Sequence, residues 1–217
     1  MCRLLAVKSP TAVPVTNALA RFAEISERSS EYQGHGWGCA WRDEDGGWRF
    51  YKKIDPVWTD DLSGFPPTTL LLAHARSAFR NEGIEIENNM PFHDDRRVFI
   101  FNGELRGVRI RAEGRIGAEK IFNYITRFDR GDPTEALRRA ADIIPRRTQY
   151  VRAMNIIMSD GDRLSVATQF GEDPEYFTVH VRRPRPGRDE PLVICSDPWP
   201  GTAGWTPLAN GTVREFR

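Results

Sequence analysis

The sequence has little of what marks membrane, secreted or metal-binding proteins. No apolar run approaches the roughly 18 residues that a membrane-spanning helix needs. The first residues lack the basic segment and uninterrupted apolar stretch of a secretory signal. The 3 cysteines lie far apart, at positions 2, 39 and 195, and form neither a disulfide framework nor a zinc pattern. We therefore expect a cytoplasmic protein.

A strong excess of charge of either sign is also missing. Lys plus Arg total 31 and Asp plus Glu total 30, so no overall field attracts nucleic acid or an anionic membrane. The 4 histidines are scattered without metal-ligand spacing, and we expect no metal and no cofactor. No repeat, low-complexity tract or linker interrupts the 217 residues. We expect a single globular domain over 1–217.

What is present is a pattern of strand blocks separated by helices. Helices are expected at 17–28, 118–128 and 133–144, the last capped by Asp132. Strands are expected at 3–8, 36–41, 48–52, 69–75, 97–101, 151–159, 163–170, 175–183, 191–196 and 212–216. This order favours an α+β fold over a parallel βαβ sheet.

Cys2 is the first residue that suggests chemistry. If Met1 is removed, one residue carries both a thiol and a free α-amine. Their reference pKa values are about 8.5 and about 7.7–8.0, so the amine can accept the thiol proton near neutral pH. A nucleophile and its base then come from one residue. For this fragment alone, the alternative is an ordinary residue at the start of a strand.

Two later fragments add polar groups at strand ends. Alternation places His74 and Arg76 on one face of a buried strand, where an arginine needs an anionic partner such as a carboxylate. That partner is either a substrate or an internal Asp or Glu. Asn102 and Gly103 follow the expected strand 97–101, and their N–H groups could stabilise an oxyanion, an interaction worth on the order of 3–4 kcal/mol. The alternative is that Asn-Gly forms a hairpin turn.

Six fragments in order and spacing resemble the class II glutamine amidotransferases, which are N-terminal-nucleophile hydrolases. They are Met-Cys-Arg-Leu-Leu at the start, Gly-Trp-Gly at 36–38, His-x-Arg at 74–76, Asn-x-x-Pro-Phe at 88–92, Asn-Gly-x-Leu at 102–105 and Ala-Glu-Lys-Ile-Phe at 118–122. The similarity continues through 155–161 and 195–198 to 204–207. It covers essentially the whole chain and is strongest to the short stand-alone branch, which includes hydrolases of γ-glutamyl amides.

The resemblance implies a four-layer α-β-β-α sandwich and assigns roles by position. Cys2 would be the nucleophile with its own amine as base, Asn102 and Gly103 would form the oxyanion hole, and Arg76 would hold the α-carboxylate of a small-molecule amide. The reaction would pass through a γ-glutamyl thioester that water hydrolyses. His74 and Trp37 are further candidates for substrate binding, although strand support for His74 and core packing for Trp37 are the preferred alternatives.

The chain departs from the family on the substrate side. The aspartate that usually contacts the substrate α-amino group is replaced by Gly117, and two family histidines are replaced by Met90 and Phe101. Losing one charge-assisted contact costs about 1.5–3 kcal/mol, or roughly ten- to 150-fold in affinity.

Three explanations for Gly117 remain open. Another acid, such as Glu82, Glu87 or Glu113, could bind the ammonium; the substrate could lack a free α-amino group; or the site could be degenerate. We expect a free-standing amidohydrolase of linear amides with altered substrate recognition. The alternative is a non-catalytic binding or regulatory subunit. Expected partners are the amide and, less directly, a synthase subunit or a second copy of the chain.

Overall fold

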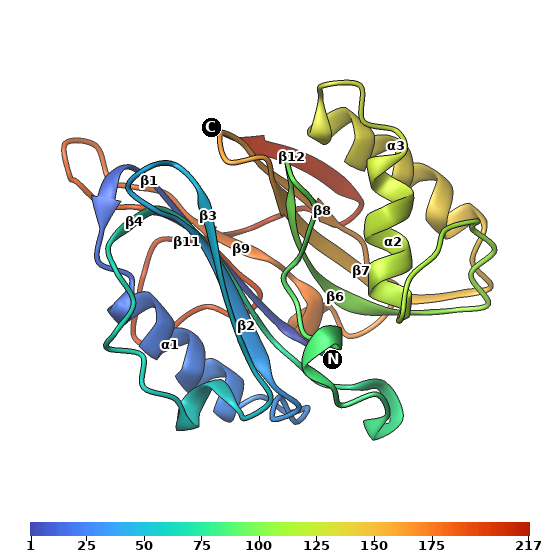
Figure 1. Ribbon diagram of the computed structural model, residues 1–217, viewed down its shortest axis with the longest axis horizontal. Coiled ribbons are helices and arrows are strands. Elements are labelled where there is room, and N and C mark those ends of the chain that lie inside the picture. Colours follow the sequence, from blue (N-terminus) through green and yellow to red (C-terminus); the bar gives the residue numbers. More distant parts are fainter. The chain divides into compact units, whose positions relative to one another are not determined.

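The computed structural model describes residues 1–217, which divide into two compact units (Figure 1). The first unit comprises 1–91 and 179–208, and the second comprises 92–178 and 209–217. Whether the two units together form the single domain expected from the sequence stays a prediction. None of the helices combines the length and the apolar character that crossing a membrane requires.

The first unit is a seven-stranded antiparallel sheet in the order β11-β9-β10-β1-β4-β2-β3. Helix α1 (Thr16–Glu27) covers one face of this sheet (Figure 1). The strands are β1 (Arg3–Val13), β2 (Trp37–Arg42), β3 (Trp48–Lys53), β4 (Thr68–Ala75), β9 (His180–Arg182), β10 (Leu192–Cys195) and β11 (Trp205–Pro207). Three short 3-10 helices lie in its connections, η1 (Val57–Thr59), η2 (Phe79–Asn81) and η3 (Ile86–Asn88).

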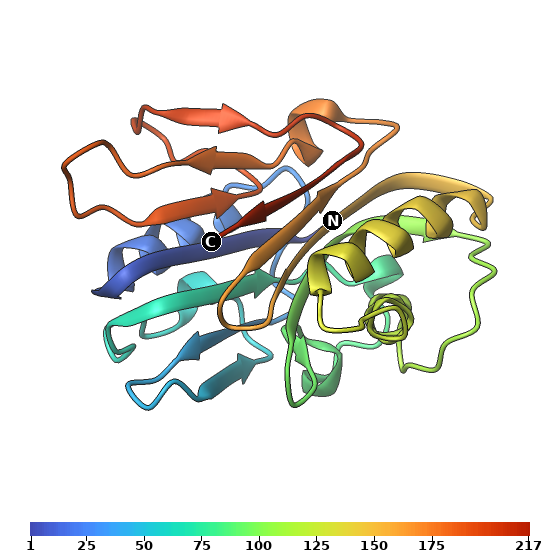
Figure 2. The same ribbon diagram turned by 90° about the horizontal axis from the view of Figure 1, so that it is seen from above.

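The second unit is a five-stranded antiparallel sheet in the order β12-β8-β7-β6-β5. Figure 2 shows α3 (Pro133–Arg146) running along this sheet with α2 (Gly117–Thr126) beside it. The strands are β5 (Phe92–His93), β6 (Val98–Arg106), β7 (Tyr150–Ser159), β8 (Leu164–Thr168) and β12 (Thr212–Phe216), and α4 (Pro174–Phe177) is a single turn.

Alternation along the strands explains which face of the first sheet is covered. Leu5 on β1 and Leu71 and Ala73 on β4 are fully buried in one cluster with Phe22 of α1. Successive residues of a strand point to opposite faces, so these odd-numbered positions face the helix. Each fully buried leucine contributes about 1.5–3 kcal/mol through burial alone. The even-numbered positions therefore present the other face of the sheet.

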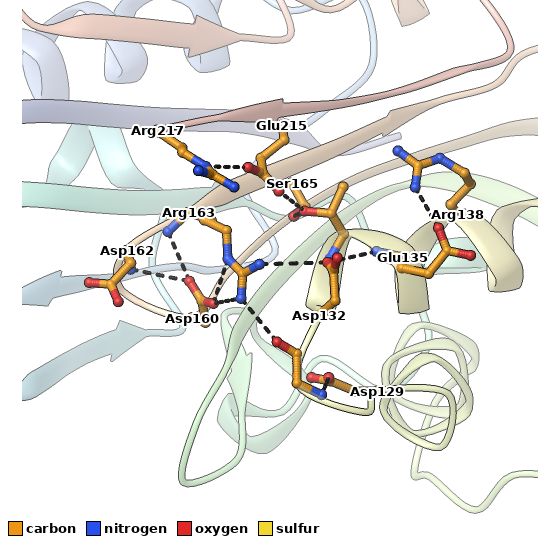
Figure 3. Close-up of polar contacts among 12 residues, drawn as sticks. Asp129, Asp132, Glu135, Arg138, Asp160, Asp162, Arg163, Ser165, Glu215 and Arg217 are labelled. Atoms are coloured by element: carbon orange, nitrogen blue, oxygen red, sulfur yellow. Dashed lines mark hydrogen bonds and ion pairs between the residues drawn. The ribbon is translucent and has the colours of Figure 1, made fainter.

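Polar contacts fix the start of α3 against the strands of the second unit (Figure 3). The Asp132 carboxylate accepts the Thr134 and Glu135 backbone N–H groups at 3.0 Å, which confirms the predicted N-cap. Arg163, just before β8, donates to Asp160 at 2.9 Å and reaches Asp132 at 3.6 Å. The β7–β8 turn and the helix terminus are thereby held together.

Two expectations about strands are wrong. The strand expected to end at 101 continues as β6 through Asn102 and Gly103 to Arg106, with Gly103 paired to Met154 of β7. A Cβ at Gly103 would lie 2.2 Å from the Ala153 carbonyl oxygen, so glycine permits close strand contact here rather than a turn. The segment expected as a strand at 175–183 begins instead with α4, because Pro174 occupies the first position of a helical turn.

The remaining expected elements are present, with ends that differ by a few residues, and the short strands β5 and β11 are additional. Helices and antiparallel sheets occur in both units, and the fold class is α+β as predicted.

Gly38 provides a test of packing in the first unit. A Cβ there would lie 2.6 Å from the Met90 carbonyl oxygen and 2.9 Å from that of Tyr51. We expect Gly38→Ala to lower the free energy of unfolding by about 1–3 kcal/mol, because backbone atoms cannot move aside cheaply. Gly64→Ala is the control, since a Cβ at Gly64 meets nothing within 4 Å. Urea denaturation of both variants measures the difference, and equal stabilities would contradict the account.

Candidate active site

The register between β1 and β4 brings Cys2 and Arg76 to the same end of the first sheet. Arg3 pairs with Ala75 and Leu4 with His74, so continuing the register by one residue places Cys2 beside Arg76. The Cys2 Sγ accepts the Ser77 backbone N–H at 3.5 Å and lies 3.8 Å from the Ser77 carbonyl oxygen. The thiol is thus held against the backbone that follows β4.

Alternation also decides the face on which these side chains lie. Ala73 and Ala75 face α1, so Arg76 and His74 point to the opposite face, and Leu4, directly opposite His74, shares it. Trp37 belongs to the α1 side, where it is fully buried and donates its Nε1–H to Asp60 at 2.9 Å. Core packing, the preferred alternative for Trp37, is the role the structure gives it, and we assign it no substrate contact.

Arg76 is a buried cation with neutral partners. Its side chain is only 5% exposed, and its guanidinium donates to the Gly83 carbonyl oxygen at 2.7 Å and to the Asn89 Oδ1 at 3.4 Å. Neither partner carries a charge, so the internal Asp or Glu bridge considered above is absent. A buried charge without a counter-ion costs several kcal/mol. The arrangement leaves Arg76 able to accept an anion.

The Asn-x-x-Pro-Phe loop supports Arg76 from the side. Asn89 donates from Nδ2 to the Lys53 carbonyl oxygen at 2.8 Å, which fixes its Oδ1 toward the guanidinium. Asn88 donates to the Gly83 carbonyl oxygen at 3.1 Å. The absence of a side chain at Gly38 lets the loop backbone lie directly on β2.

Burial and nearby charges act on the Cys2 thiol in opposite directions. Burial raises its pKa above the usual value of 9.0, and Glu31 adds to this effect. The positive chain terminus, the Ser77 N–H and Arg76 each lower it, but burial is the largest cause. The net result is a raised pKa, so the thiol needs a base to react at neutral pH.

In the chain that retains Met1, polar groups bind that residue closely. The Met1 ammonium forms an ion pair with Glu31, and the Gln33 Nε2 donates to the Met1 carbonyl oxygen. Gln33 is fully buried and also donates to the Glu31 carbonyl oxygen at 2.7 Å. Glu31 and Gln33 therefore form a polar clamp around Met1 and its peptide carbonyl.

His35 completes the polar surroundings of Arg76. Its Nδ1 accepts the Ala78 backbone N–H at 2.8 Å, so the ring is neutral in this arrangement. Burial lowers the pKa of His35, and the positive charges of Arg76 and the chain terminus lower it further. His35 thus orders the chain after β4 without adding a second cation.

Asn102 and Gly103 belong to the second unit, on β6. Asn102 is fully buried, and neither its Nδ2 nor its Oδ1 has a hydrogen-bond partner. Its register neighbour Asn155 donates to the Phe177 carbonyl oxygen at 2.7 Å and accepts the Gln169 N–H at 3.2 Å. A buried amide without partners costs about 1–3 kcal/mol, so its presence needs a reason other than packing.

The other residues singled out from the sequence lie either in the core or at the surface. His74 is fully buried within β4, paired with Leu4 and Gly38. Gly117 is exposed at the first position of α2, and no atom lies within 4 Å of where its Cβ would be. Met90 and Phe101, which replace family histidines, are both buried apolar side chains.

Ser77, Glu31, Gln33 and His35 were not predicted from the sequence as site residues. The signal for Ser77 was its place directly after Arg76 at the strand end. The other three residues lie in an irregular segment before β2, and only the sheet order brings that segment to the end of β4.

Comparisons with known proteins agree with this architecture, although no protein-family model matches the sequence. A glutamine aminotransferase class-II domain protein from Silicibacter pomeroyi superposes with a TM-score of 0.65 at 18% identity, over 99% of this chain and 98% of that one. A predicted glutamine amidotransferase from Pseudomonas aeruginosa gives 0.64 at 17% identity, over 99% and 97%. The chain therefore has the fold of class II glutamine amidotransferase domains, an N-terminal-nucleophile hydrolase fold, as predicted.

Among curated proteins, the chain is similar to the gamma-glutamyl-hercynylcysteine sulfoxide hydrolase of Mycolicibacterium smegmatis. The two are 26% identical over 204 residues, which are 90% of this chain and 83% of that protein.

The raised pKa of Cys2 predicts how its alkylation depends on pH. Iodoacetamide reacts with the thiolate, so the labelling rate of the Met1-bearing protein should rise by about tenfold per pH unit from pH 7 and keep rising beyond pH 9. Peptide mass spectrometry measures the rate. Cys195 is the internal control, because burial raises its pKa to about 12 and it should stay unlabelled. A plateau in Cys2 labelling below pH 8 would show that the thiol pKa is depressed instead.

The different hydrogen bonding of Asn102 and Asn155 predicts that their alanine variants differ in free energy of unfolding. Asn155→Ala removes two hydrogen bonds to backbone groups and should lower the free energy of unfolding by about 2 kcal/mol or more. Asn102→Ala removes none and should cost at least about 1 kcal/mol less. Thermal and urea denaturation of both variants provide the measurement. Equal losses would mean that Asn102 serves the fold as Asn155 does.

Proposed function

We propose that this protein is a cysteine N-terminal-nucleophile amidohydrolase. Its substrate is glutamine, a γ-glutamyl amide or a related carboxylate-bearing linear amide. Removal of Met1 frees the α-amine of Cys2, which serves as the base for its own thiol. Arg76 binds the substrate carboxylate, and Asn102 and Gly103 donate to the oxyanion, as the resemblance to the family assigns them.

One observation carries the proposal: a buried guanidinium with only neutral partners lies at the same strand end as the Cys2 thiol. An arginine that serves only the fold would be paired with an acid. The similarity to a hydrolase of a γ-glutamyl compound and to amidotransferase domains supports amide chemistry. Asn102, which is buried without hydrogen-bond partners, supports the oxyanion assignment.

The reaction proceeds in two balanced steps. The Cys2 thiol loses its proton to the α-amine, and Sγ attacks the amide carbonyl to form a C–S bond. The C–N bond then breaks, and the proton passes from the α-ammonium to the leaving ammonia or amine. Water next attacks the thioester while the α-amine accepts its proton, and the C–S bond breaks to release the carboxylic acid and regenerate the thiol.

A second candidate function is a non-catalytic binding subunit. The contacts of Met1 with Glu31 and Gln33 favour it, because they hold Met1 in place. While Met1 is present, the Cys2 nitrogen belongs to a peptide bond and cannot act as a base. The replacement of the ammonium-binding aspartate by Gly117 favours it as well.

Labelling by 6-diazo-5-oxo-L-norleucine, an electrophilic glutamine analogue, separates the two candidates. In a preparation that begins at Cys2, we expect one covalent adduct, located on Cys2 and absent in Cys2→Ala. Arg76→Ala should raise the inhibition constant KI at least about 30-fold, because the analogue's carboxylate loses a buried charged partner. Intact mass and inactivation kinetics give both results.

Circular dichroism of each variant controls for folding. Retention of Met1 in the purified protein, together with no adduct in either form, would favour the binding subunit. An adduct at Cys39 or Cys195 would contradict the assignment of the nucleophile.

A further inference from the structure

Residues 79–89 follow β4 and supply one carbonyl oxygen that accepts three hydrogen bonds. The Gly83 carbonyl oxygen accepts the Arg76 Nη2–H at 2.7 Å, the Glu85 backbone N–H at 2.9 Å and the Asn88 Nδ2–H at 3.1 Å. Because Arg76 and Glu85 share this acceptor, the guanidinium and the Glu85 backbone nitrogen lie within about 6 Å of each other.

Glu85 is therefore an acidic residue whose backbone shares a hydrogen-bond acceptor with Arg76. It is exposed and makes no ion pair with Arg76. Burial lowers the pKa of the guanidinium, and the charge of Cys2 and, to a smaller extent, that of Glu85 raise it. The backbone of Glu85 thus lies near the guanidinium, and no ion pair joins the two charged groups. A small zwitterion can bridge such a pair, with each of its charges meeting the opposite one.

The other acids considered for this role lack such a position. Glu82 and Glu87 lie in the same segment, but neither contributes to the electrostatic surroundings of Arg76. Glu31 acts on the Cys2 thiol and makes no contribution to the electrostatic surroundings of Arg76. Glu113 likewise makes no contribution to the electrostatic surroundings of Arg76.

We infer that Arg76 and Glu85 together bind the α-amino-acid end of the substrate, Arg76 through the carboxylate and Glu85 through the ammonium. This inference rests on the proposed function and narrows it to amides of γ-glutamyl compounds with a free α-amino group. Glu85 takes over the task of the family aspartate at the position of Gly117. Substrates that lack the ammonium are thereby disfavoured.

The test compares two probes that differ only in the ammonium. One is 6-diazo-5-oxo-L-norleucine and the other is 6-diazo-5-oxohexanoate, its analogue without the amino group. With protein that begins at Cys2, we expect Glu85→Gln to raise KI for the first probe about tenfold and to leave KI for the second within twofold. The maximal rate of inactivation, kinact, should stay unchanged for both, because Glu85 touches no reacting atom.

Glu82→Gln and Glu87→Gln are matched controls, since they remove one exposed negative charge from the same segment and should change neither KI. Glu85→Asp, which keeps the carboxylate, should recover part of the lost affinity.

The outcomes separate the inference from the proposed function. Unchanged KI values in Glu85→Gln, with Cys2 still labelled, would overturn the role of Glu85 alone. Equal or tighter binding of the probe without the ammonium by the unsubstituted protein would also overturn it. No labelling of that protein by either probe would overturn the proposed function and this inference together.

Discussion

The candidate site depends on one constraint, the antiparallel register between β1 and β4. Because Arg3 faces Ala75 in this register, Cys2 arrives beside Arg76 and its thiol meets the Ser77 backbone. A shift of β1 by one residue would turn its even-numbered side chains toward α1 and its odd-numbered core side chains toward the opposite face. Leu5 and Ala73, which are fully buried under α1, make such a shift costly. Core packing and site geometry are therefore fixed by the same pairing.

The cost of a buried guanidinium explains the loop that surrounds it. Arg76 is taken from water without a carboxylate, and the Gly83 carbonyl and the Asn89 amide replace only part of its hydration. Those acceptors are held in turn by Asn88, Lys53 and the close contact at Gly38. Such an arrangement lowers stability when empty and gains free energy when an anion enters, which is the behaviour of a binding site.

Local signals in the sequence predicted the elements that have strong local causes. Asp132 before Pro133 marked the start of α3, and a continuous apolar run marked the buried strand β4. The pair Asn102-Gly103 was wrongly expected to end the strand, because glycine favours a turn and also permits close contact between strands. Only the pairing with β7 distinguishes the two cases. For the site, Cys2 and Arg76 were predictable from residue type and order. Glu31 and Glu85 were not, since both lie in irregular segments whose position is set by long-range packing.

The replacements on the substrate side form a consistent pattern under this account. Met90 and Phe101 are buried apolar side chains, so two polar positions of the family have become part of the packing. Gly117 leaves the start of α2 without a carboxylate, while Glu85 belongs to the segment whose Gly83 carbonyl oxygen binds Arg76. With the proposed role of Glu85, recognition of the ammonium would come from the same segment that binds the guanidinium. One loop can thus hold the charges of Arg76 and Glu85 in place together. A substrate that carries both an ammonium and a carboxylate then gains more binding free energy than a substrate that carries one of them.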